Sequence, residues 1–152
     1  MITVIQDTRE QTPYSFKDMQ VEVRSISTGD YAIKGFERYF RIERKQDVDE
    51  LIGNLTTGRD RFFRELDRLR AFKYRFLIVG CNWQDIADGA YRSRANKDAM
   101  RETVNSIIID YEIPIIFACT DRQGNRIAEN LIRRYDKMLT RFVDAINKTK
   151  EK

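Results

Sequence analysis

Residues 39–55 read YFRIERKQDVDELIGNL, and the apolar period changes along this stretch from two residues to between three and four. The first half, residues 39–45, is rich in aromatic and β-branched side chains, which predicts a strand. The second half repeats apolar residues at helical spacing, namely Val48, Leu51, Ile52 and Leu55. Asp47 precedes this helix and Glu50 follows three residues later, a capping-box arrangement with Asp in place of Ser or Thr. The stretch therefore predicts a strand that leads directly into an amphipathic helix.

Short apolar runs on the N-terminal side of this stretch predict three more strands. They lie at residues 2–6, 20–26 and 30–34. The connections between the predicted strands are too short for the crossovers that parallel neighbours require. We therefore predict an antiparallel meander of four strands in the first 45 residues.

Helices and strands alternate on the C-terminal side. The pattern predicts helices at 59–72, 97–111 and about 125–148, and buried strands at 75–81 and 113–119. Strands separated by helices are typical of parallel crossover units. We therefore expect an α/β fold with a mixed central sheet of about six strands flanked by helices. The length of 152 residues suits one domain, residues 1–152.

The composition excludes several kinds of chemistry. The chain has no histidine, so it has no Ser-His-Asp or Cys-His machinery and no histidine-bound zinc or haem. A metal would be held by carboxylates and carbonyls, which favours Mg²⁺ or Mn²⁺. We expect Cys81 and Cys119 to be buried free thiols rather than a disulfide. The sequence shows no membrane span and no leader, so we expect a cytoplasmic protein, nucleoid-associated in a microbe or phage and nuclear in a eukaryote.

The positive charge is concentrated in one segment. Residues 38–75 hold 11 basic and seven acidic residues, which accounts for the whole net charge of +4. Nine of the 11 basic residues are arginine, whose planar guanidinium suits bidentate contacts to phosphate. A solvated helix face with salt bridges would show the same charge density, so the count alone leaves both interpretations open.

Acidic residues and one lysine coincide on two of the predicted strands. Glu43 and Lys45 lie two residues apart and therefore on the same strand face, whereas Arg44 points to the opposite face and its carbonyl lies between them. Asp30, on the neighbouring strand, can lie beside Glu43, and Asp7 at the end of the first strand can add a third carboxylate. Two adjacent carboxylates repel each other unless a divalent cation neutralises them. A lysine beside that cation can hold or deprotonate the attacking water and stabilise the transition state. A charged, solvated strand would carry the same short triplet.

The longer pattern is more specific. Gly29-Asp30 followed by ERKQDVD at 43–49 resembles the GD…ERKxxxD signature of the XPF-family structure-selective endonucleases. Similar elements occur in the family's order at residues 5–10 (IQDTRE), 51–55, 58–69 and 74–79. The resemblance implies a restriction-endonuclease-like core and Mg²⁺- or Mn²⁺-dependent cleavage of DNA near a flap, fork or junction. The alternative is an inactive nuclease-like subunit that binds DNA or has a regulatory role.

The resemblance also implies roles for single residues. Asp30 and Glu43 would bind metal, with Asp7 as a further acid, the Arg44 carbonyl as a candidate ligand, and Lys45 as a catalytic residue. Arg9, Glu10, Arg44, Asp49 and Glu65 would support the site. The arginines expected to grip DNA phosphates are Arg44, Arg59, Arg61, Arg64 and Arg68.

Four of the supporting residues have simpler interpretations. Arg44 and Asp49 would form an ion pair that braces the strand–helix junction, or Asp49 would only favour the helix dipole in the first turn. Arg9 and Glu10 would otherwise be a mutual surface pair.

The second helix departs from the family pattern. Glu65 stands where the family commonly has Gln, so it is either an added acid near the metal or, as we favour, an i,i+4 partner of Arg61. Either Arg59 or Arg61 corresponds to the family's arginine, because two extra residues separate Gly58 from the better match.

The last predicted helix is apolar over a wide face. One stripe comprises Ile127, Leu131, Tyr135, Met138, Phe142 and Ile146, and other apolar residues widen it. We find no helix-hairpin-helix pattern, so we expect a lone nuclease module that binds branched DNA through its basic segment. Part of the stripe would meet a second copy and form a homodimer. A core helix within one chain is the alternative.

Overall fold

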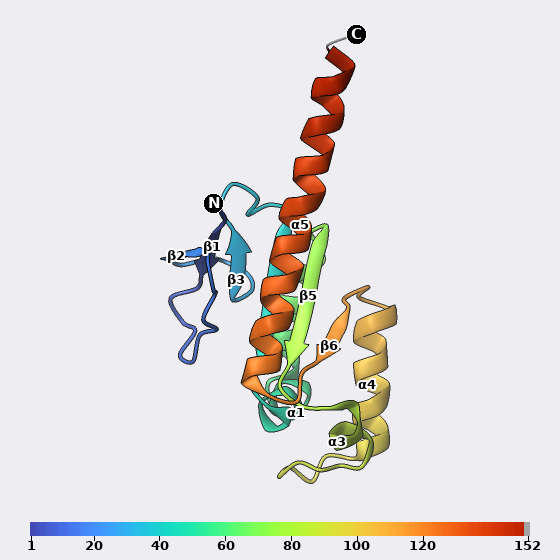
Figure 1. The fold of residues 1–152 in the computed structure, drawn as a ribbon. Helices are drawn as coiled ribbons and strands as arrows, with labels where there is room; N and C mark the ends of the chain where they lie inside the picture. The colour runs from blue at the N-terminus through green and yellow to red at the C-terminus, as the bar shows by residue number, and fades with distance from the viewer. Residues whose placement is uncertain (151–152) are drawn as a thin grey trace.

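The computed structural model describes residues 1–150, which form one mixed six-stranded sheet with helices on both faces (Figure 1). The strands are β1 (Thr3–Gln6), β2 (Gln20–Val23), β3 (Tyr31–Ile33), β4 (Phe40–Lys45), β5 (Tyr74–Val79) and β6 (Ile115–Phe117). The helices are α1 (Val48–Leu55), α2 (Arg59–Leu69), α3 (Trp83–Ala87), α4 (Lys97–Ile109) and α5 (Asp121–Lys150). The strand order is β2-β1-β3-β4-β5-β6, so the predicted mixed α/β sheet is confirmed.

The predicted antiparallel meander is wrong at its first step. β1 pairs with β3 and β3 with β4 in antiparallel fashion, but β2 lies parallel to β1, with Thr3 opposite Gln20. The segment 7–19 between them has about the dozen residues that a parallel neighbour needs to return to the same end of the sheet. β4, β5 and β6 are parallel, as the crossover pattern predicted.

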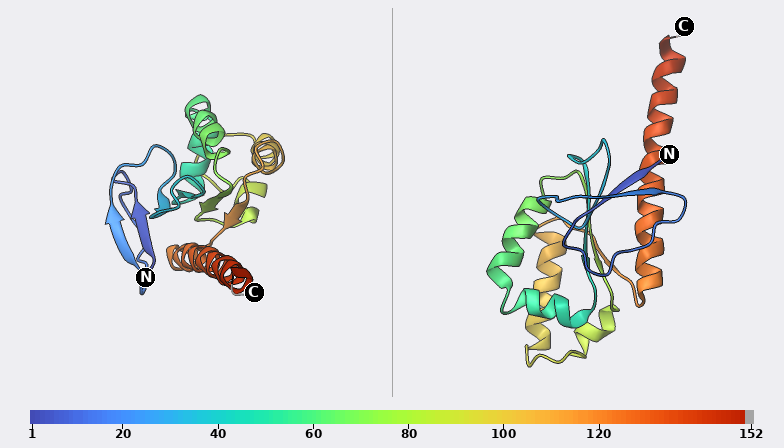
Figure 2. Two further views of the ribbon diagram at one scale, coloured as in Figure 1. Left: turned by 90° about the horizontal axis from the view of Figure 1, so that it is seen from above. Right: turned by 90° about the vertical axis from the view of Figure 1, so that its left-hand side faces the viewer.

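Two apolar layers sandwich the sheet. Leu77 and Val79 belong to the cluster formed with α1, α2 and α4, whereas Ile78 between them belongs to the cluster formed with α5. Seen from above, α5 covers one face of the sheet alone and the other long helices lie on the opposite face (Figure 2). This alternation explains why the apolar run of β5 reads as fully buried in the sequence.

Some predicted elements change their extent. α2 ends at Leu69 instead of residue 72, and α5 begins at Asp121 instead of residue 125. The five-residue helix α3 was not predicted, although a capping box between Asn82 and Asp85 starts it. Both cysteines are free, and Cys81 is buried, but Cys119 is exposed, contrary to prediction.

α5 is long and only partly packed. Its 30 residues span about 45 Å, and the C-terminal part extends beyond the sheet (Figure 1). Within residues 1–150, no helix combines the length and apolarity required to cross a membrane.

Two glycines shape the end of the sheet where β4 finishes. Gly29 has φ +80°, a left-handed conformation that starts the turn into Asp30. Gly80 follows β5, and a Cβ there would overlap the carbonyl oxygen of Gln46. The close approach lets β5 pass the β4–α1 junction, where α1 begins three residues after Lys45.

Candidate active site

Asp30 and Glu43 face each other across two antiparallel strands. Tyr31 pairs with Ile42, so Asp30 and Glu43 form the next cross-strand position. The backbone holds Asp30 firmly: its N–H donates to the Ile42 carbonyl at 2.8 Å, and its Oδ2 accepts from the Arg44 N–H at 2.7 Å. The structure therefore brings together the two acids that the sequence placed on neighbouring strands.

Lys45 completes a buried charge cluster with Glu43. The Lys45 Nζ lies 3.1 Å from Glu43 Oε1 and 4.0 Å from Glu50 Oε1. Its ammonium also sits 4.8 Å from the ring centroid of Phe62 on α2. Lys45 and Glu43 share one face of β4, as the period of two predicted, and α1 and α2 cover that face.

Burial and mutual charge shift the ionisation of these groups. Burial and the neighbouring Glu43 carboxylate raise the pKa of Asp30 to about 8. Burial also raises the pKa of Glu43, although the ammonium of Lys45 opposes this. Burial alone would lower the pKa of Lys45, but the carboxylate of Glu43 outweighs it and the pKa is raised. Near neutral pH the facing acids therefore retain a proton and Lys45 is a cation.

A cavity of about 200 Å³ opens onto this cluster. Its polar lining consists of four acids, one lysine, three arginines and the hydroxyls that precede Gly29: Asp7, Asp30, Glu43, Glu65, Lys45, Arg9, Arg61, Arg68, Ser27 and Thr28. Asp30, Glu43 and Lys45 also line a second cavity on the side of Glu10 and Gln46. The acid pair therefore borders two cavities.

Asp7 lines the cavity but is already engaged. Its carboxylate is 1% exposed and accepts from Arg9 Nε at 2.6 Å and from the Ile26 N–H at 3.0 Å. Burial opposes ionisation of this carboxyl, but its bonds to Arg9 and Ile26 outweigh that effect and lower its pKa. Asp7 forms a wall of the site that also holds Arg9 in place.

The donor set fits a hard divalent cation. Across residues 1–150 no three Cys, Asp or Glu side chains gather as a ready metal-binding group. Mg²⁺, however, usually takes only one or two carboxylates and keeps waters and substrate phosphate as its other ligands. Asp30 and Glu43 would supply those two carboxylates, with the Arg44 carbonyl as the predicted further oxygen.

The ionisation of Asp30 predicts a proton linkage. At pH 7 the binding of Mg²⁺ or Mn²⁺ is expected to release roughly one proton, and affinity should rise about tenfold from pH 6 to pH 7 and less steeply as the pH approaches 8. Calorimetric titration in two buffers of different ionisation enthalpy measures the release. Asp30→Asn is the control that should abolish it, and proton-independent binding by the natural chain would contradict the prediction.

The expected brace between Arg44 and Asp49 does not form. Arg44 points to the opposite face, as predicted, where it bonds Asp121 of α5 at 2.9 Å and stacks at 4.2 Å on the ring of Tyr14. Asp49 instead accepts from the Arg92 N–H at 2.8 Å. Buried as it is, Arg44 braces the sheet against α5 and is not placed to grip phosphate.

The other supporting residues also find different partners. Arg9 pairs with Asp7, not with Glu10, and Glu10 lies 3.6 Å from Arg44. Glu65 pairs with Arg61 at 3.5 Å in the favoured i,i+4 geometry, and both line the cavity. Glu65 is therefore the predicted partner of Arg61, and its carboxylate also borders the cavity.

The arginines of α2 divide into two groups. Arg61 and Arg68 line the cavity beside the acids. Arg59 stacks 4.7 Å from the ring of Phe63 and its NH1 lies 3.4 Å from Thr103, so it ties α2 to α4. Arg64 is exposed and does not line the cavity. Of the two candidates, Arg61 is the one that faces the site.

Comparison with known proteins places this geometry in a family. The family described as the ERCC4 domain matches residues 6–131. The structure is similar to XPF from Aeropyrum pernix in complex with DNA, at a TM-score of 0.71 and 22% identity, over 90% of this chain and 66% of that chain. It is also similar to XPF from Aeropyrum pernix at a TM-score of 0.69 and 20% identity, over 88% of this chain and 61% of that chain.

The chain thus spans somewhat less than two thirds of those solved chains, and at such identity their likeness establishes the fold. None of the curated proteins compared with the chain matches it. The family match covers most of the chain and includes the acids, the lysine and the arginines described above. The chain therefore belongs to the ERCC4 domain family, a family of structure-specific DNA endonucleases.

Proposed function

We propose that the chain is a Mg²⁺- or Mn²⁺-dependent endonuclease that hydrolyses phosphodiester bonds near a flap, fork or junction in DNA. The observation that carries the proposal is the pairing of Asp30 and Glu43 across β3 and β4, with Lys45 against Glu43 in the same cavity. Facing carboxylates are costly in a fold unless a function uses them. Family membership supports the same reaction class.

The residues have distinct tasks in this reaction. Asp30 and Glu43 would hold the divalent cation, which would supply Lewis-acid activation of water and neutralise charge on the phosphate. Lys45 remains an ammonium beside Glu43, so it orients the water and stabilises developing negative charge rather than removing a proton. Arg61 and Arg68 bind the flanking phosphates and orient the strand.

A catalytically inactive DNA-binding subunit is the second candidate function. Such a subunit would lack one of the acids or the lysine, whereas Asp7, Asp30, Glu43 and Lys45 all line one cavity here. The acid set therefore favours activity.

The decisive experiment offers matched flap, fork, four-way and linear DNA with Mn²⁺ or Mg²⁺. We expect strand cleavage near the branch, none in a chelator, and none by the Asp30→Asn variant. Cleavage that survives in Asp30→Asn, or a natural chain inert on every substrate with both metals, would overturn the assignment.

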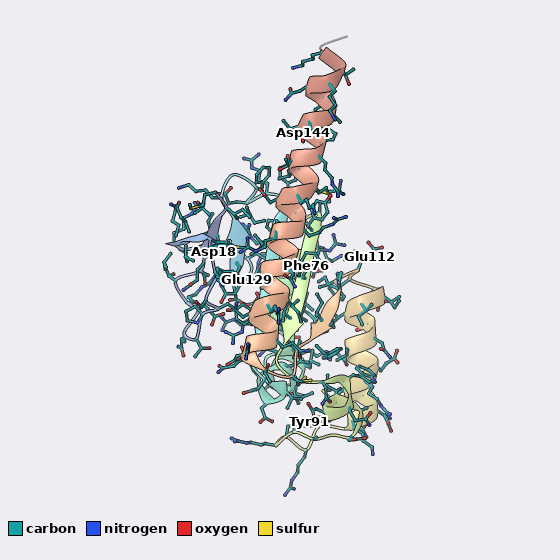
Figure 3. All side chains as sticks on the ribbon, in the orientation of Figure 1. Asp18, Phe76, Tyr91, Glu112, Glu129 and Asp144 are labelled. Carbon is teal, nitrogen blue, oxygen red and sulfur yellow. The ribbon has the colours of Figure 1, made fainter. Side chains whose placement is uncertain are left out.

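We further propose that the active form is a homodimer. A largely apolar groove of about 500 Å³ lies between the sheet and the C-terminal half of α5, lined by Phe40, Tyr74, Phe76, Leu131, Tyr135, Met138 and Phe142 among others. Phe142 is 67% exposed and Ile146 is 41% exposed, on the part of α5 that extends past the sheet near Asp144 (Figure 3). Such a stripe on a projecting helix is typical of an interface.

An antiparallel pairing of two α5 helices fits this stripe. With Phe142 at the two-fold axis, Met138 lies opposite Ile146 of the second copy. Apolar residues therefore meet apolar residues along the stripe.

The dimer prediction concerns Phe142. Light scattering after size exclusion at micromolar concentration should give twice the 18.1 kDa mass of the chain, and Phe142→Glu should return it to the single-chain mass. Val143→Glu, an exposed apolar neighbour outside the groove, is the control that leaves the mass unchanged. A natural chain of single mass would refute the dimer.

A further inference from the structure

The loop between α3 and α4 presents a basic surface whose role the site described above leaves open. Residues 89–97 read GAYRSRANK and contain three basic residues and no acidic one. Arg92 has a side chain that is 94% exposed, and Arg94 and Lys97 are also exposed. The charge projects into solvent rather than into a salt-bridge network.

The loop is nevertheless fixed in shape. Tyr91 packs against the apolar cluster of α1, α2 and α4, and its hydroxyl donates to the Ala95 carbonyl at 2.8 Å. Ala95 N–H donates to Ser93 Oγ at 3.1 Å, and Asn96 caps α4. A tyrosine anchor and internal hydrogen bonds thus hold the two arginines outward.

Asp49 fastens this loop to the active-site end of the sheet. Its Oδ1 accepts from the Arg92 N–H at 2.8 Å, and its Oδ2 lies 3.6 Å from Arg92 Nε. Asp49 is the last acid of the ERKQDVD stretch and lies four residues after Lys45. The main tie uses the backbone of Arg92 and the ion pair uses only Nε, so the terminal guanidinium nitrogens stay exposed and can bind another group.

The loop lies close enough to the cavity to contact the same DNA. Four residues span at most about 14 Å, which limits the distance between Lys45 and Asp49. The loop near Tyr91 runs past α1 at the end of the sheet where β4 finishes (Figures 1 and 3). Duplex DNA carries a phosphate every 3.4 Å along each strand, so the loop would meet phosphates within about four to five nucleotides of the bond cleaved.

We propose that residues 89–97 form a second DNA-binding element, in which Arg92 and Arg94 grip phosphates of the duplex arm, and that Asp49 is the positioning residue that holds the loop in register with the cavity. This proposal rests on the proposed nuclease function and adds that the loop holds the duplex arm of the substrate. It lies on the α4 side of the site, whereas Arg61 and Arg68 approach from α2.

The test measures the salt dependence of binding. Each variant is made in the Asp30→Asn background so that DNA stays intact, and a fluorescent flap DNA is titrated by anisotropy. Arg92→Ala should lower the salt slope by ~0.9 and weaken binding roughly fivefold to tenfold at 0.1 M salt, and adding Arg94→Ala should lower the slope by about as much again. Arg38→Ala, an exposed arginine at the opposite end of the sheet, should change neither.

The sign of the Asp49 effect separates positioning from simple charge. If Asp49 only contributed negative charge, Asp49→Ala would tighten DNA binding, as is expected for the matched control Asp60→Ala in the first turn of α2. If Asp49 positions the loop, Asp49→Ala should weaken binding and lower the salt slope as Arg92→Ala does. In the active background both variants should raise KM and change kcat less than twofold.

The outcomes distinguish the two proposals. A natural chain that neither binds nor cleaves the flap would refute the nuclease function itself. A natural chain that binds and cleaves, with Arg92→Ala equal to Arg38→Ala, would refute the loop alone. The binding result for Asp49→Ala counts only if its circular dichroism spectrum matches that of the parent protein. If the spectra differ, the binding result for Arg92→Ala decides whether the loop contacts DNA.

Discussion

Asp30→Asn is expected to slow cleavage by about a thousandfold and at the same time to stabilise the metal-free fold. The amide retains an oxygen that can accept from the Arg44 N–H, so the geometry of β3 and β4 is preserved. It removes one of the two carboxylates that face each other, and with it the charge that would hold the cation. Loss of activity combined with a gain of stability is the signature of a strained functional site.

The pH dependence gives the sign of the stability effect. The pKa of Asp30 is raised to about 8 in the folded chain by burial and by Glu43, above the unfolded value near 4. A raised pKa contributes stability that is fully present below pH 4 and is lost as the pH rises toward 8. Relative to Asp30→Asn, the natural chain should therefore lose on the order of 5 kcal/mol between those limits.

Urea unfolding with and without Mg²⁺ measures this effect. In a chelator, Asp30→Asn should be more stable than the natural chain at pH 8, and this difference in stability should shrink at pH 5. Saturating Mg²⁺ should remove the difference at pH 8, because it stabilises only the natural chain. Lys45→Ala is the comparison for loss of activity. It should be as inactive as Asp30→Asn but less stable than the natural chain, because it leaves the buried Glu43 unpaired. An Asp30→Asn variant that is less stable than the natural chain at pH 8 would refute the facing-carboxylate account.

Local patterns predicted the parts of the site that depend on one strand or one helix. The period of two placed Glu43 and Lys45 on one face and Arg44 on the other, and the helical period paired Arg61 with Glu65. These relations need only the geometry of the element itself. The α/β class followed from the same local evidence.

Relations between distant segments could not be predicted in this way. Asp49 bonds a residue 43 positions away and Arg44 bonds one 77 positions away, whereas the sequence suggested that they bond each other. Sequence spacing holds no information on which of many surface charges will meet once the sheet closes. The parallel β2 was missed for the same reason, because strand direction depends on the path of residues 7–19.

Arg44→Ala is expected to destabilise the fold by about 3–5 kcal/mol, because it leaves the carboxylate of Glu10, only 11% exposed and 3.6 Å from the guanidinium, without its cation. The Arg44 side chain is only 4% exposed. Its guanidinium bonds the Thr12 carbonyl and Asp121, and stacks on Tyr14. Removing the guanidinium leaves these polar groups without a partner at the junction of β4, the 7–19 segment and α5. Arg44→Lys should recover less than half of the loss, since lysine lacks the planar fork that makes these contacts together.

Arg59→Ala is the matched control for this prediction. Arg59 also stacks on an aromatic ring, Phe63, but it is exposed, so its loss should cost only about 1 kcal/mol. Urea unfolding of the variants at pH 7 gives the comparison, and DNA binding of the folded fraction adds a second readout. If Arg44 gripped phosphate, Arg44→Ala would keep its stability and lower the salt slope of binding by ~1. If Arg44 instead joins the sheet to α5, Arg44→Ala should cause a large loss of stability and leave the salt slope of DNA binding unchanged, because the buried guanidinium is not available to DNA.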